Sequence, residues 1–539
     1  MTVIRSMVVP GGADFQRRRT EMLALVEGFR ELEAGVIRHA ERARGRFEAR
    51  GQLMPRERVA RLLDPGAPFL ELSTLAGTSM HDDDGNRTLS GGGNIIGVGL
   101  VCGVRCMVVA NESAIKGGSI TPMGLRKSLR AQEIALREKL PMISLVESGG
   151  ANLLYQSELF VDGGRVFANM ARLSAAGIPQ ITVVHGSSTA GGAYMPGLSD
   201  YVVMVRDRAR VFLAGPPLVK AALGEDADEL ELGGAEMHAT VAGTAEYIAE
   251  DDTHGVLLAR EILASLDWNR TLGAETVSPA RPPRHSPDEL AGAVPTDARE
   301  PYDVKEVIAR IVDGSDFLEF KAGFGAETVC GHARVNGRSV GILGNNGPIF
   351  PQGSVKAAQF IQLCQQSDLP LLFLMNTTGY MVGKEAEQAG AVKHGSKMIQ
   401  AVATATVPKI TIVLGGAYGA GNYGMCGRAY DPAFLFSWPT AKVAVMGGQQ
   451  AATVMKIITR AKFERKGLPL VEEVLEGMAA DLAGKLDRQS TALFATARVW
   501  DDGVIDPRDT RRVVGICLDI CAESRRRTLS PVSFGVARG

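Results

Sequence analysis

The sequence predicts an α/β protein built as a tandem duplication of one unit, each with a mostly parallel sheet covered by helices. Apolar runs of strand length alternate with segments of helical spacing, which is typical of βαβ units. The two halves of the 539-residue chain also repeat each other at near-constant spacing. A fixed internal period of this kind indicates a repeated structural unit.

The repeat is most regular in the centre of each half. The matched pairs that differ by 229 positions are Pro141 and Pro370, Gly150 and Gly379, Pro179 and Pro408, and Gly191 and Ala420. Earlier matches have other spacings: Phe69 and Phe317 differ by 248, and Gly97 and Gly331 by 234. Gap-free agreement over the central stretch is hard to obtain by chance, so both halves are expected to share one fold.

Within each half the predicted order is strand, helix, strand, glycine turn, helix, strand. In the first half we expect helices at 132–138 and 165–175 and strands at 141–146 and 181–184. In the second half we expect helices at 357–366 and 396–405 and strands at 369–375 and 410–414. Strands joined through helices are expected to be parallel.

Four segments are predicted along the chain. Residues 1–55, rich in Arg, Glu and Ala, form an added helical arm, and residues 56–275 form the first domain. Residues 276–301 contain six prolines and no hydrophobic periodicity, which indicates an extended surface linker. Residues 302–539 form the second domain.

Composition excludes several classes of function. The 59 Lys and Arg against 60 Asp and Glu argue against a nucleic-acid or anionic-membrane partner bound by bulk charge. The start has no secretory or transit signal, and no run approaches the ~18 apolar residues of a membrane span. Seven cysteines, an odd number, fit a reduced protein, so we expect a cytoplasmic location and no membrane.

A metal site has little support in the sequence. Cys102 with Cys106 and Cys517 with Cys521 have a spacing that could form a four-thiolate zinc site. Their apolar context favours buried thiols instead. The eight His include no pair at ligand spacing, so no metal is expected.

Each half places glycine-rich turns after successive strands, each opening a helix. A helix N-terminus offers unpaired N–H groups to an oxyanion, and glycine lets a ligand approach the backbone. Because the repeat pairs Gly191 and Gly192 with Ala420 and Gly421, we predict two similar oxyanion holes as the catalytic groups. The alternative is that these glycines serve only tight turns and close packing.

Other motifs are weaker. The segment GSSTAG at Gly186 lacks the nucleophile-elbow spacing, although His185 is adjacent, and the Gly91–Gly93 run is not followed by the residues of a P-loop. Glu147 and Glu57 could be the acids of a hydratase, but neither has a convincing carboxylate partner. Val454–Ile457 reads VMKI and superficially resembles a biotinylation site, yet its helical context favours a packed helix.

From about Arg56 onward, the chain resembles the carboxyltransferase (β) subunits of biotin-dependent acyl-CoA carboxylases. The strings that carry this resemblance include LRAQEIALREKLPMISLVESGGAN, VVHGSSTAGGAYMPGLSD, VFLAGPPLVK, NTTGYMVGK, GGAYGAGNYGMCGRAYDP and WDDGVIDPRDTRRVVG. It implies the crotonase-like (ClpP/crotonase) fold with two carboxyltransferase domains. The strings AGPPLVK and NYGMCGRAY look closest to the 3-methylcrotonyl-CoA and geranyl-CoA carboxylase branch.

The resemblance implies a mechanism that needs no side-chain base. The acyl-CoA thioester oxygen would lie at Gly191 and Gly192, and the ureido oxygen of biotin at Ala420 and Gly421. Acyl-CoA would be bound by Ser148, Gly149, Gly150, Ala151 and Gly163, and biotin by Thr378, Gly379, Tyr380 and Met381. Carboxybiotin would be carried by a partner biotin carboxylase and carrier (α) subunit, not by this chain.

The family also implies a homo-oligomer. A dimer would be the minimum active unit, and a β6 hexamer within an α6β6 complex is typical. Relatives of the methylcrotonyl type have a longer loop with a bulky aromatic residue where FVDGGRVF here has Gly163. We therefore expect either a deeper acyl pocket that admits a longer or more branched chain such as geranyl-CoA, or a loop that is merely re-routed.

Several other functions remain open at this stage. The nearest is the carboxyltransferase subunit of a biotin-dependent acyl-CoA decarboxylase, which has the same turns and fold. Propionyl-CoA or acetyl-CoA carboxylation is a further substrate alternative. A stand-alone crotonase-like hydratase or hydrolase, or a non-catalytic scaffold, would not need a biotin protein.

Overall fold

The computed structural model describes residues 2–81, 91–297, 300–533 and 535–536. The chain divides into two compact units. The C-half unit contains residues 1–30, 276–496 and 500–518, and the N-half unit contains residues 31–275, 497–499 and 519–539. The unit bounds therefore differ from the predicted segments at both ends of the chain. The predicted arm is divided between the two units after residue 30, and residues 519–539 belong to the N-half unit.

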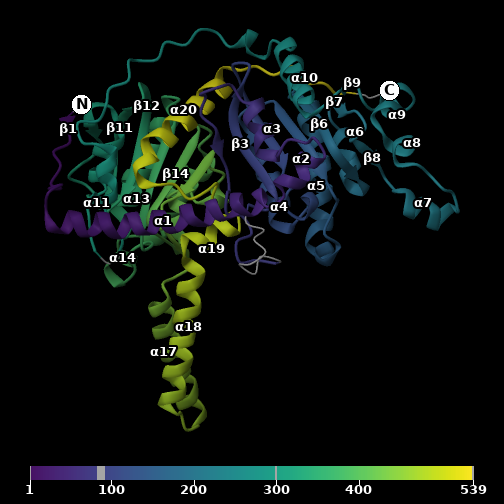
Figure 1. Cartoon of the computed structure of the whole chain (residues 1–539). Coiled ribbons are helices and arrows are strands. Elements are labelled where there is room, and N and C mark those ends of the chain that lie inside the picture. Colours follow the sequence, from purple (N-terminus) through teal and green to yellow (C-terminus); the bar gives the residue numbers. More distant parts are fainter. Residues whose placement is uncertain (1, 82–90, 298–299, 534, 537–539) are drawn as a thin grey trace. The chain divides into compact units, whose positions relative to one another are not determined.

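The N-half unit is built on an eight-stranded sheet (Figure 1). Its order is β2-β3-β4-β5-β6-β7-β9, and β8 pairs with β6. The pairs β2–β3 and β3–β4 are antiparallel, and all later pairs are parallel. The strands are β2 (Leu70–Glu71), β3 (Asn94–Val101), β4 (Val104–Asn111), β5 (Met142–Ser148), β6 (Gln180–Thr189), β7 (Tyr201–Val205), β8 (Arg210–Phe212) and β9 (Tyr247–Ala249).

Helices connect the parallel strands of this unit and cover its sheet. Successive residues of the central strands are buried and mostly apolar, because a parallel sheet is covered on both faces. The helices and helical turns are α2 (Arg44–Ala49), α3 (Pro55–Leu62), η1 (Lys116–Gly118), α4 (Pro122–Arg137), η2 (Leu153–Tyr155), α5 (Gln156–Ala175), η3 (Ala190–Ala193), α6 (Tyr194–Gly197), α7 (Pro216–Leu223), α8 (Glu229–Gly233), α9 (Ala235–Thr240), α10 (Asp252–Ser265) and η4 (Trp268–Thr271).

The C-half unit repeats this plan (Figure 1). Its sheet has the order β1-β10-β11-β12-β13-β14-β15, with β16 paired to β14, and it is parallel from β12 onward. The strands are β1 (Thr2–Val3), β10 (Asp316–Glu319), β11 (Thr328–Val335), β12 (Arg338–Asn345), β13 (Leu371–Thr377), β14 (Lys409–Tyr418), β15 (Phe434–Ser437) and β16 (Lys442–Ala444).

The helices of the C-half unit bury a second core around Phe360, Phe373 and Met398. They are η5 (Pro287–Glu289), α11 (Leu290–Ala293), α12 (Lys305–Ile311), η6 (Asp313–Ser315), α13 (Pro351–Gln366), α14 (Lys384–Gln388), α15 (Ala391–Thr404), α16 (Gly419–Gly424), η7 (Arg428–Tyr430), α17 (Gly448–Lys466), α18 (Glu472–Ser490) and η8 (Pro507–Asp509). Three helices have residues in both units: α1 (Ala13–Glu41), α19 (Ala492–Ala497) and α20 (Thr510–Arg526).

The predicted central elements are present, but three local predictions were wrong. Strand β6 continues through Thr189, so the segment HGSST is strand rather than turn. The segment FVDGGRVF is not a loop but part of α5, a helix that buries Leu159, Val166 and Met170 on one face. The proline-rich segment 276–301 is not wholly at the surface either, since α11 is buried.

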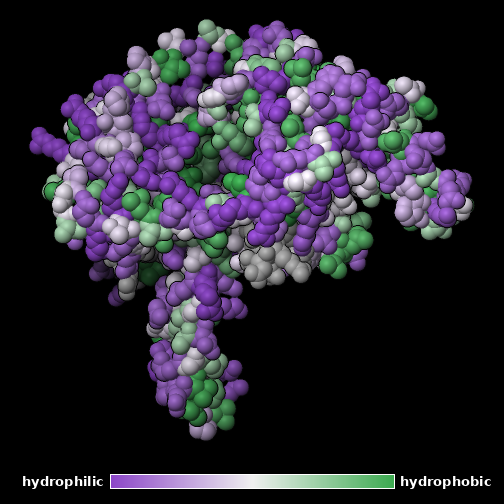
Figure 2. All heavy atoms as spheres, viewed as in Figure 1, coloured by the Kyte–Doolittle hydropathy of each residue, from purple (hydrophilic) through white to green (hydrophobic). Residues whose placement is uncertain are grey.

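Helices α17 and α18 form a hairpin that extends from the sheet of the C-half unit (Figure 1). Apolar side chains are visible on this hairpin (Figure 2). Those more than half exposed are Ile457, Ile458, Leu468, Val471, Val474 and Met478. Among the described residues, no helix is both long and apolar enough to cross a membrane.

Candidate active site

The first glycine turn lies where β5 and β6 of the N-half unit end. Ser148, the last residue of β5, is in register with Ser188 near the end of β6. Directly after β6, Ala190 has a φ of +53°, and Gly150, which follows β5, has a φ of +86°. A left-handed alanine is uncommon, and such strain is concentrated at functional sites.

Ser148 fixes the backbone of this turn. Its hydroxyl donates to the carbonyl of Gly118 at 2.9 Å and accepts from the N–H of Gly150 at 3.1 Å. The carbonyl of Gly150 in turn accepts from the N–H of Ile120 at 2.9 Å. The predicted neighbours are close by: the N–H of Gly149 donates to Gly117, and Ala151 pairs with Ile120.

Gly191 and Gly192 lie in η3, which opens the helix after β6. The N–H groups at the start of a helix are the ones that lack partners within it, so this is the position at which backbone amides can bind a ligand. A Cβ built on Gly191 would meet no heavy atom within 4 Å, so the space in front of this residue is open. Gly192 is held by its carbonyl, which accepts from Ser188 Oγ at 2.8 Å.

A cavity of about 690 Å³ opens in front of this turn, between the sheet and helices α4 and α5. We call it the acyl channel, after the acyl group that the resemblance to carboxyltransferase subunits would place at this turn. Along β5 it is lined by alternate residues, from Ser148 at the turn through Val146 and Ser144 to Met142. Of the predicted site residues, Ser148, Ala151, Gly163, Gly191 and Gly192 line it.

Two consecutive glycines lie within α5 where it lines the acyl channel. A glycine inside a helix costs roughly 1 kcal/mol relative to alanine, so Gly163 and Gly164 need a reason. A Cβ at either position would meet nothing within 4 Å. Close packing therefore does not require them, and their effect is to leave the channel wide.

A buried charge network lies directly behind Ser148. Arg58 pairs with Glu147 at 2.7 Å and with Asp252 at 3.2 Å, and His185 Nδ1 lies 2.9 Å from Asp252 Oδ1. Burial alone would raise the pKa of Asp252, but its partners His185 and Arg58 outweigh burial and lower it to about 2. Burial and the Arg58 charge lower the pKa of His185, so that imidazole is neutral. His185 Nε2, the nitrogen that would face a serine nucleophile, is buried and has no hydrogen-bond partner among the described residues, so a serine hydrolase gains no support.

The second glycine turn, in the C-half unit, repeats the first in detail. The N–H of Gly379 donates to Thr377 Oγ1 at 3.1 Å, as that of Gly150 does to Ser148. The carbonyl of Gly379 accepts from Ile349 at 2.9 Å. Gly419, at the position of Ala190, has a φ of +54°. The internal repeat therefore extends to individual hydrogen bonds.

The surroundings of the second turn differ from those of the first. Ala420 lines a cavity of about 930 Å³ whose other residues include Tyr423, Arg428, Ser437, Val443, Leu482, Phe494, Trp500 and Asp501. Gly421 is buried beside it, and a Cβ there would lie 2.8 Å from the Cα of Gly379. The two glycines of this turn are therefore in direct contact.

The four predicted biotin residues follow β13 and do not line that cavity. Thr378 is exposed, Gly379 is buried, and Tyr380 and Met381 are half-buried. The hydroxyl of Tyr380 lies 3.4 Å from the carbonyl of Gly395, and its ring packs against the glycines of helices α15 and α16. The structure thus brings Gly379 together with Gly421 but leaves Thr378 at the surface.

Sequence reasoning missed the left-handed pair Ala190 and Gly419 and the loop pair Gly118 and Gly347. Both pairs have a spacing of 229, and both glycines of the second pair have positive φ. Aligning the two halves of the sequence at a spacing of 229 residues is enough to find both pairs. It carries no signal for Gln132, which lines the acyl channel, because residue 361 in the other half is isoleucine.

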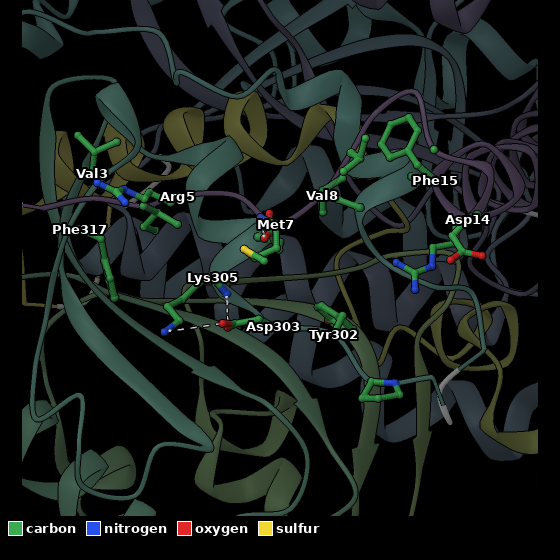
Figure 3. A pocket seen from close by; sticks show the side chains of 18 of the residues that line it. Val3, Arg5, Met7, Val8, Asp14, Phe15, Tyr302, Asp303, Lys305 and Phe317 are labelled. Carbon is green, nitrogen blue, oxygen red and sulfur yellow. Dashed lines mark hydrogen bonds and ion pairs between the residues drawn. The ribbon is translucent and has the colours of Figure 1, made fainter.

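Another cavity, of about 930 Å³, lies beneath the N-terminal segment of the C-half unit (Figure 3). Several of its charged side chains already have partners: Lys305 pairs with Glu319 and Asp303, and Glu306 accepts from Ser6. None of the predicted site residues is among the described residues that line it.

Within the described ranges, no group of three or more His, Cys, Asp or Glu side chains could hold a metal ion, so the cysteine pairs gain no support as a zinc site.

Two α/β units, each with a glycine turn at the end of its parallel strands, define a two-domain carboxyltransferase. The profile of the carboxyl transferase domain family matches residues 46–535. The chain belongs to this family. It is the carboxyltransferase of a biotin-dependent acyl-CoA carboxylase, and the predicted fold class and enzyme class are confirmed.

Three similar proteins are informative. A probable biotin-dependent acyl-coenzyme A carboxylase β2 subunit of Mycobacterium tuberculosis is 52% identical over 494 residues, 92% of each chain. The 3-methylcrotonyl-coenzyme A carboxylase β1 subunit of that organism is 46% identical over all of both chains. The crystal structure of the P. aeruginosa geranyl-CoA carboxylase β subunit is 59% identical, with a TM-score of 0.94 over all of both chains.

Proposed function

We propose that the chain transfers CO2 from carboxybiotin to a branched enoyl-CoA longer than 3-methylcrotonyl-CoA, of which geranyl-CoA is the model. The observation that carries this proposal is the open space at Gly163 and Gly164 in the wall of the acyl channel. An apolar channel of about 690 Å³ suits a long branched chain. The similarity to a geranyl-CoA carboxylase β subunit supports the same substrate class.

The first glycine turn would bind the thioester. Gly191 and Gly192 lie at a helix start and line the acyl channel, where an enolate oxygen would receive hydrogen bonds from their amides. Ser148, Gly149, Gly150 and Ala151 would form the edge against which the CoA portion lies. The hydrogen bonds of Ser148 hold this edge in position before substrate binds.

The second glycine turn would bind biotin. When bound, carboxybiotin supplies the CO2 and, after its release, a nitrogen base. The amides of Ala420 and Gly421 would stabilise the negative charge on the ureido oxygen, and Thr378, Gly379, Tyr380 and Met381 would lie along the ring. The cavity beside Ala420, with the aromatic rings of Tyr423 and Trp500, suits a compact apolar bicycle.

The composition of the acyl channel supports a base that comes from outside the chain. Among the described residues that line it, none is an Asp, Glu, His, Lys or Arg. A hydratase or isomerase of this fold would need an acid or base there. Amide donors without a base fit a reaction in which the biotin nitrogen removes the substrate proton.

The partner would be a biotin carboxylase and carrier (α) subunit that carries the biotin, and this chain would need no metal. Oligomerisation would follow the family, with a dimer as the minimum and a β6 ring in an α6β6 complex, in the cytoplasm. Exposed apolar side chains at the channel mouth support a covering copy; they are Leu153, Leu154, Phe160 and Val161. Transfer in the decarboxylation direction, or to propionyl-CoA or acetyl-CoA, would use the same turns.

The experiment is the substitution Gly163→Phe, assayed in the complex with the biotin-bearing partner. A phenyl ring in the open part of the channel should lower kcat/KM for geranyl-CoA relative to 3-methylcrotonyl-CoA by about 10–100-fold. Gly28→Phe is the matched control, because Gly28 is also a helical glycine with nothing within 4 Å of its Cβ but lies outside the channel. An unchanged ratio in the Gly163→Phe enzyme would contradict the proposal.

A further inference from the structure

The end of the acyl channel away from the glycine turn is polar. Its polar side chains, contributed by α4 and β5, are Gln132 and Ser144, whereas Asn94, Asn111 and Ser128 line the channel nearer the turn. Apolar residues surround them, including Val109, Leu125 and Val166. A site for a purely hydrocarbon chain does not need hydrogen-bonding groups at its far end.

The register of the sheet gives the depth of this polar end. Ser144 precedes Ser148 by four residues on β5, which corresponds to about 13 Å along the strand. Val109 on β4 is in register with Ser144. Helix α4 runs back from the turn toward the start of β5, so Gln132 lies one helical turn deeper than Ser128. Gln132 and Ser144 are therefore both distant from the reacting carbonyl.

Most of the polar groups nearer the turn bond to one another. Asn111 Nδ2 donates to Asn94 Oδ1 at 3.0 Å, and Asn111 Oδ1 accepts from the N–H of Glu147 at 3.2 Å. Ser128 Oγ donates to the carbonyl of Gly124 at 3.0 Å. These groups hold β3, β4 and α4 together and are occupied without a substrate.

Gln132 differs, because one end of its amide has a partner and the other does not. Its Nε2 donates to the carbonyl of Val166 on α5 at 3.0 Å, which fixes the orientation of the amide. Its Oε1 is buried and has no hydrogen-bond partner among the described residues, and the residue is only 3% exposed. A buried amide oxygen without a donor is unusual in a folded protein and indicates a missing donor.

We propose that Gln132 is a specificity-determining residue that accepts a hydrogen bond from a hydroxyl group at the far end of the acyl chain. The preferred substrates would be branched enoyl-CoAs hydroxylated at the terminal carbon. The inference rests on the proposed function, because it needs the acyl group to occupy this channel. Ser144, which lines the same part of the channel, would lie beside that hydroxyl.

The test compares three ligands on the full-length protein by calorimetry: geranyl-CoA, its derivative with a hydroxyl on the terminal carbon, and the derivative with fluorine there. Fluorine has a similar size to hydroxyl but cannot donate a hydrogen bond. The wild-type protein should bind the hydroxylated ligand about tenfold more tightly than the other two. Without carboxybiotin no ligand is converted, so binding is measured free of turnover.

The variant Gln132→Met, which keeps the length of the side chain but removes the acceptor, should bind all three ligands alike. Equal affinity of wild type for the hydroxylated and fluorinated ligands would overturn the inference even if Gln132→Met does not fold. Failure of all three ligands to bind would overturn the proposed function itself, so the two failures are distinguishable.

Discussion

The two glycine turns have nearly the same backbone but different surroundings. Gly150 and Gly379 make equivalent bonds to Ser148 and Thr377, and both turns place a left-handed residue directly after the strand. The first turn faces a channel enclosed by α4 and α5. The second faces a cavity formed partly by the hairpin of α17 and α18.

Under the proposed function, duplication preserved the oxyanion donors while the walls changed to suit two ligands. A donor pair recognises any carbonyl oxygen that gains charge, whereas the walls determine which molecule carries it. One turn can therefore serve a thioester and the other a cyclic urea. The predictions that follow test where the two turns are equivalent and where they are not.

The largest effect is expected at Gly421. A Cβ there would lie 2.8 Å from the Cα of Gly379, so Gly421→Ala must displace the backbone of the turn. Turnover in the reconstituted complex should fall by about 10²–10³-fold, the loss typical of one missing oxyanion donor. The equivalent change Gly192→Ala meets only Ser188 Oγ, at 3.6 Å, and should cost less than about tenfold. Equal losses in the two variants would show that the turns are constrained alike.

The next effect concerns the hydroxyls that fix the turns. Ser148→Ala leaves the carbonyl of Gly118 and the N–H of Gly150 without a buried partner, which should lower the free energy of unfolding by about 1–3 kcal/mol. It should also weaken acyl-CoA binding, because Gly150 is no longer held. Thr377→Val should destabilise the protein similarly and leave acyl-CoA affinity unchanged. Chemical denaturation and calorimetry on both variants would measure this, and weakened acyl-CoA binding by Thr377→Val would contradict the assignment of the two turns.

A pH effect is expected from Asp501 in the second cavity. Burial raises the pKa of this carboxyl from 3.8 to about 6, although hydroxyls of Ser437 and Thr496 oppose the rise. The folded protein therefore holds this proton where the unfolded chain has lost it, and stability falls as pH rises from about 4 to 6. Asp501→Asn should flatten that part of the stability profile in thermal melts. An identical profile for the variant and wild type would show that Asp501 does not titrate in this range.

The smallest effect is expected at Lys456. It lies within α17 and donates to Glu476 on α18 at 3.0 Å, an exposed contact worth at most about 1 kcal/mol. Lys456→Ala should leave carboxylation unchanged, and the purified wild-type chain should give no signal with streptavidin. A biotinylated chain whose signal is lost in the variant would contradict the need for a separate biotin carrier.

The sequence predicted the duplicated α/β fold because apolar periodicity and the 229-residue spacing are both properties of the chain itself. Gly191, Gly192, Ala420 and Gly421 were predicted from the same repeat. The helical character of the segment around Gly163 was not predicted, because two glycines normally argue against a helix. Only packing of the neighbouring apolar residues overrides that preference.

The walls of the sites could not be predicted from the repeat. Gln132, Tyr423 and Trp500 come from different elements, and folding alone brings them to their cavities. The last residues of the chain likewise belong to the N-half unit although they follow the second half in sequence. Such placements depend on tertiary contacts, for which a local pattern carries no signal.

The most direct test of the central claim is an assay of the tagged chain purified together with its partners from its own lysate. The account predicts a large streptavidin-reactive partner and carboxylation of geranyl-CoA that requires both ATP and bicarbonate. It also predicts no conversion of acyl-CoA by the chain alone. Conversion of an acyl-CoA by the isolated chain, without a biotin protein, would contradict the claim that its two glycine turns serve a thioester and a biotin.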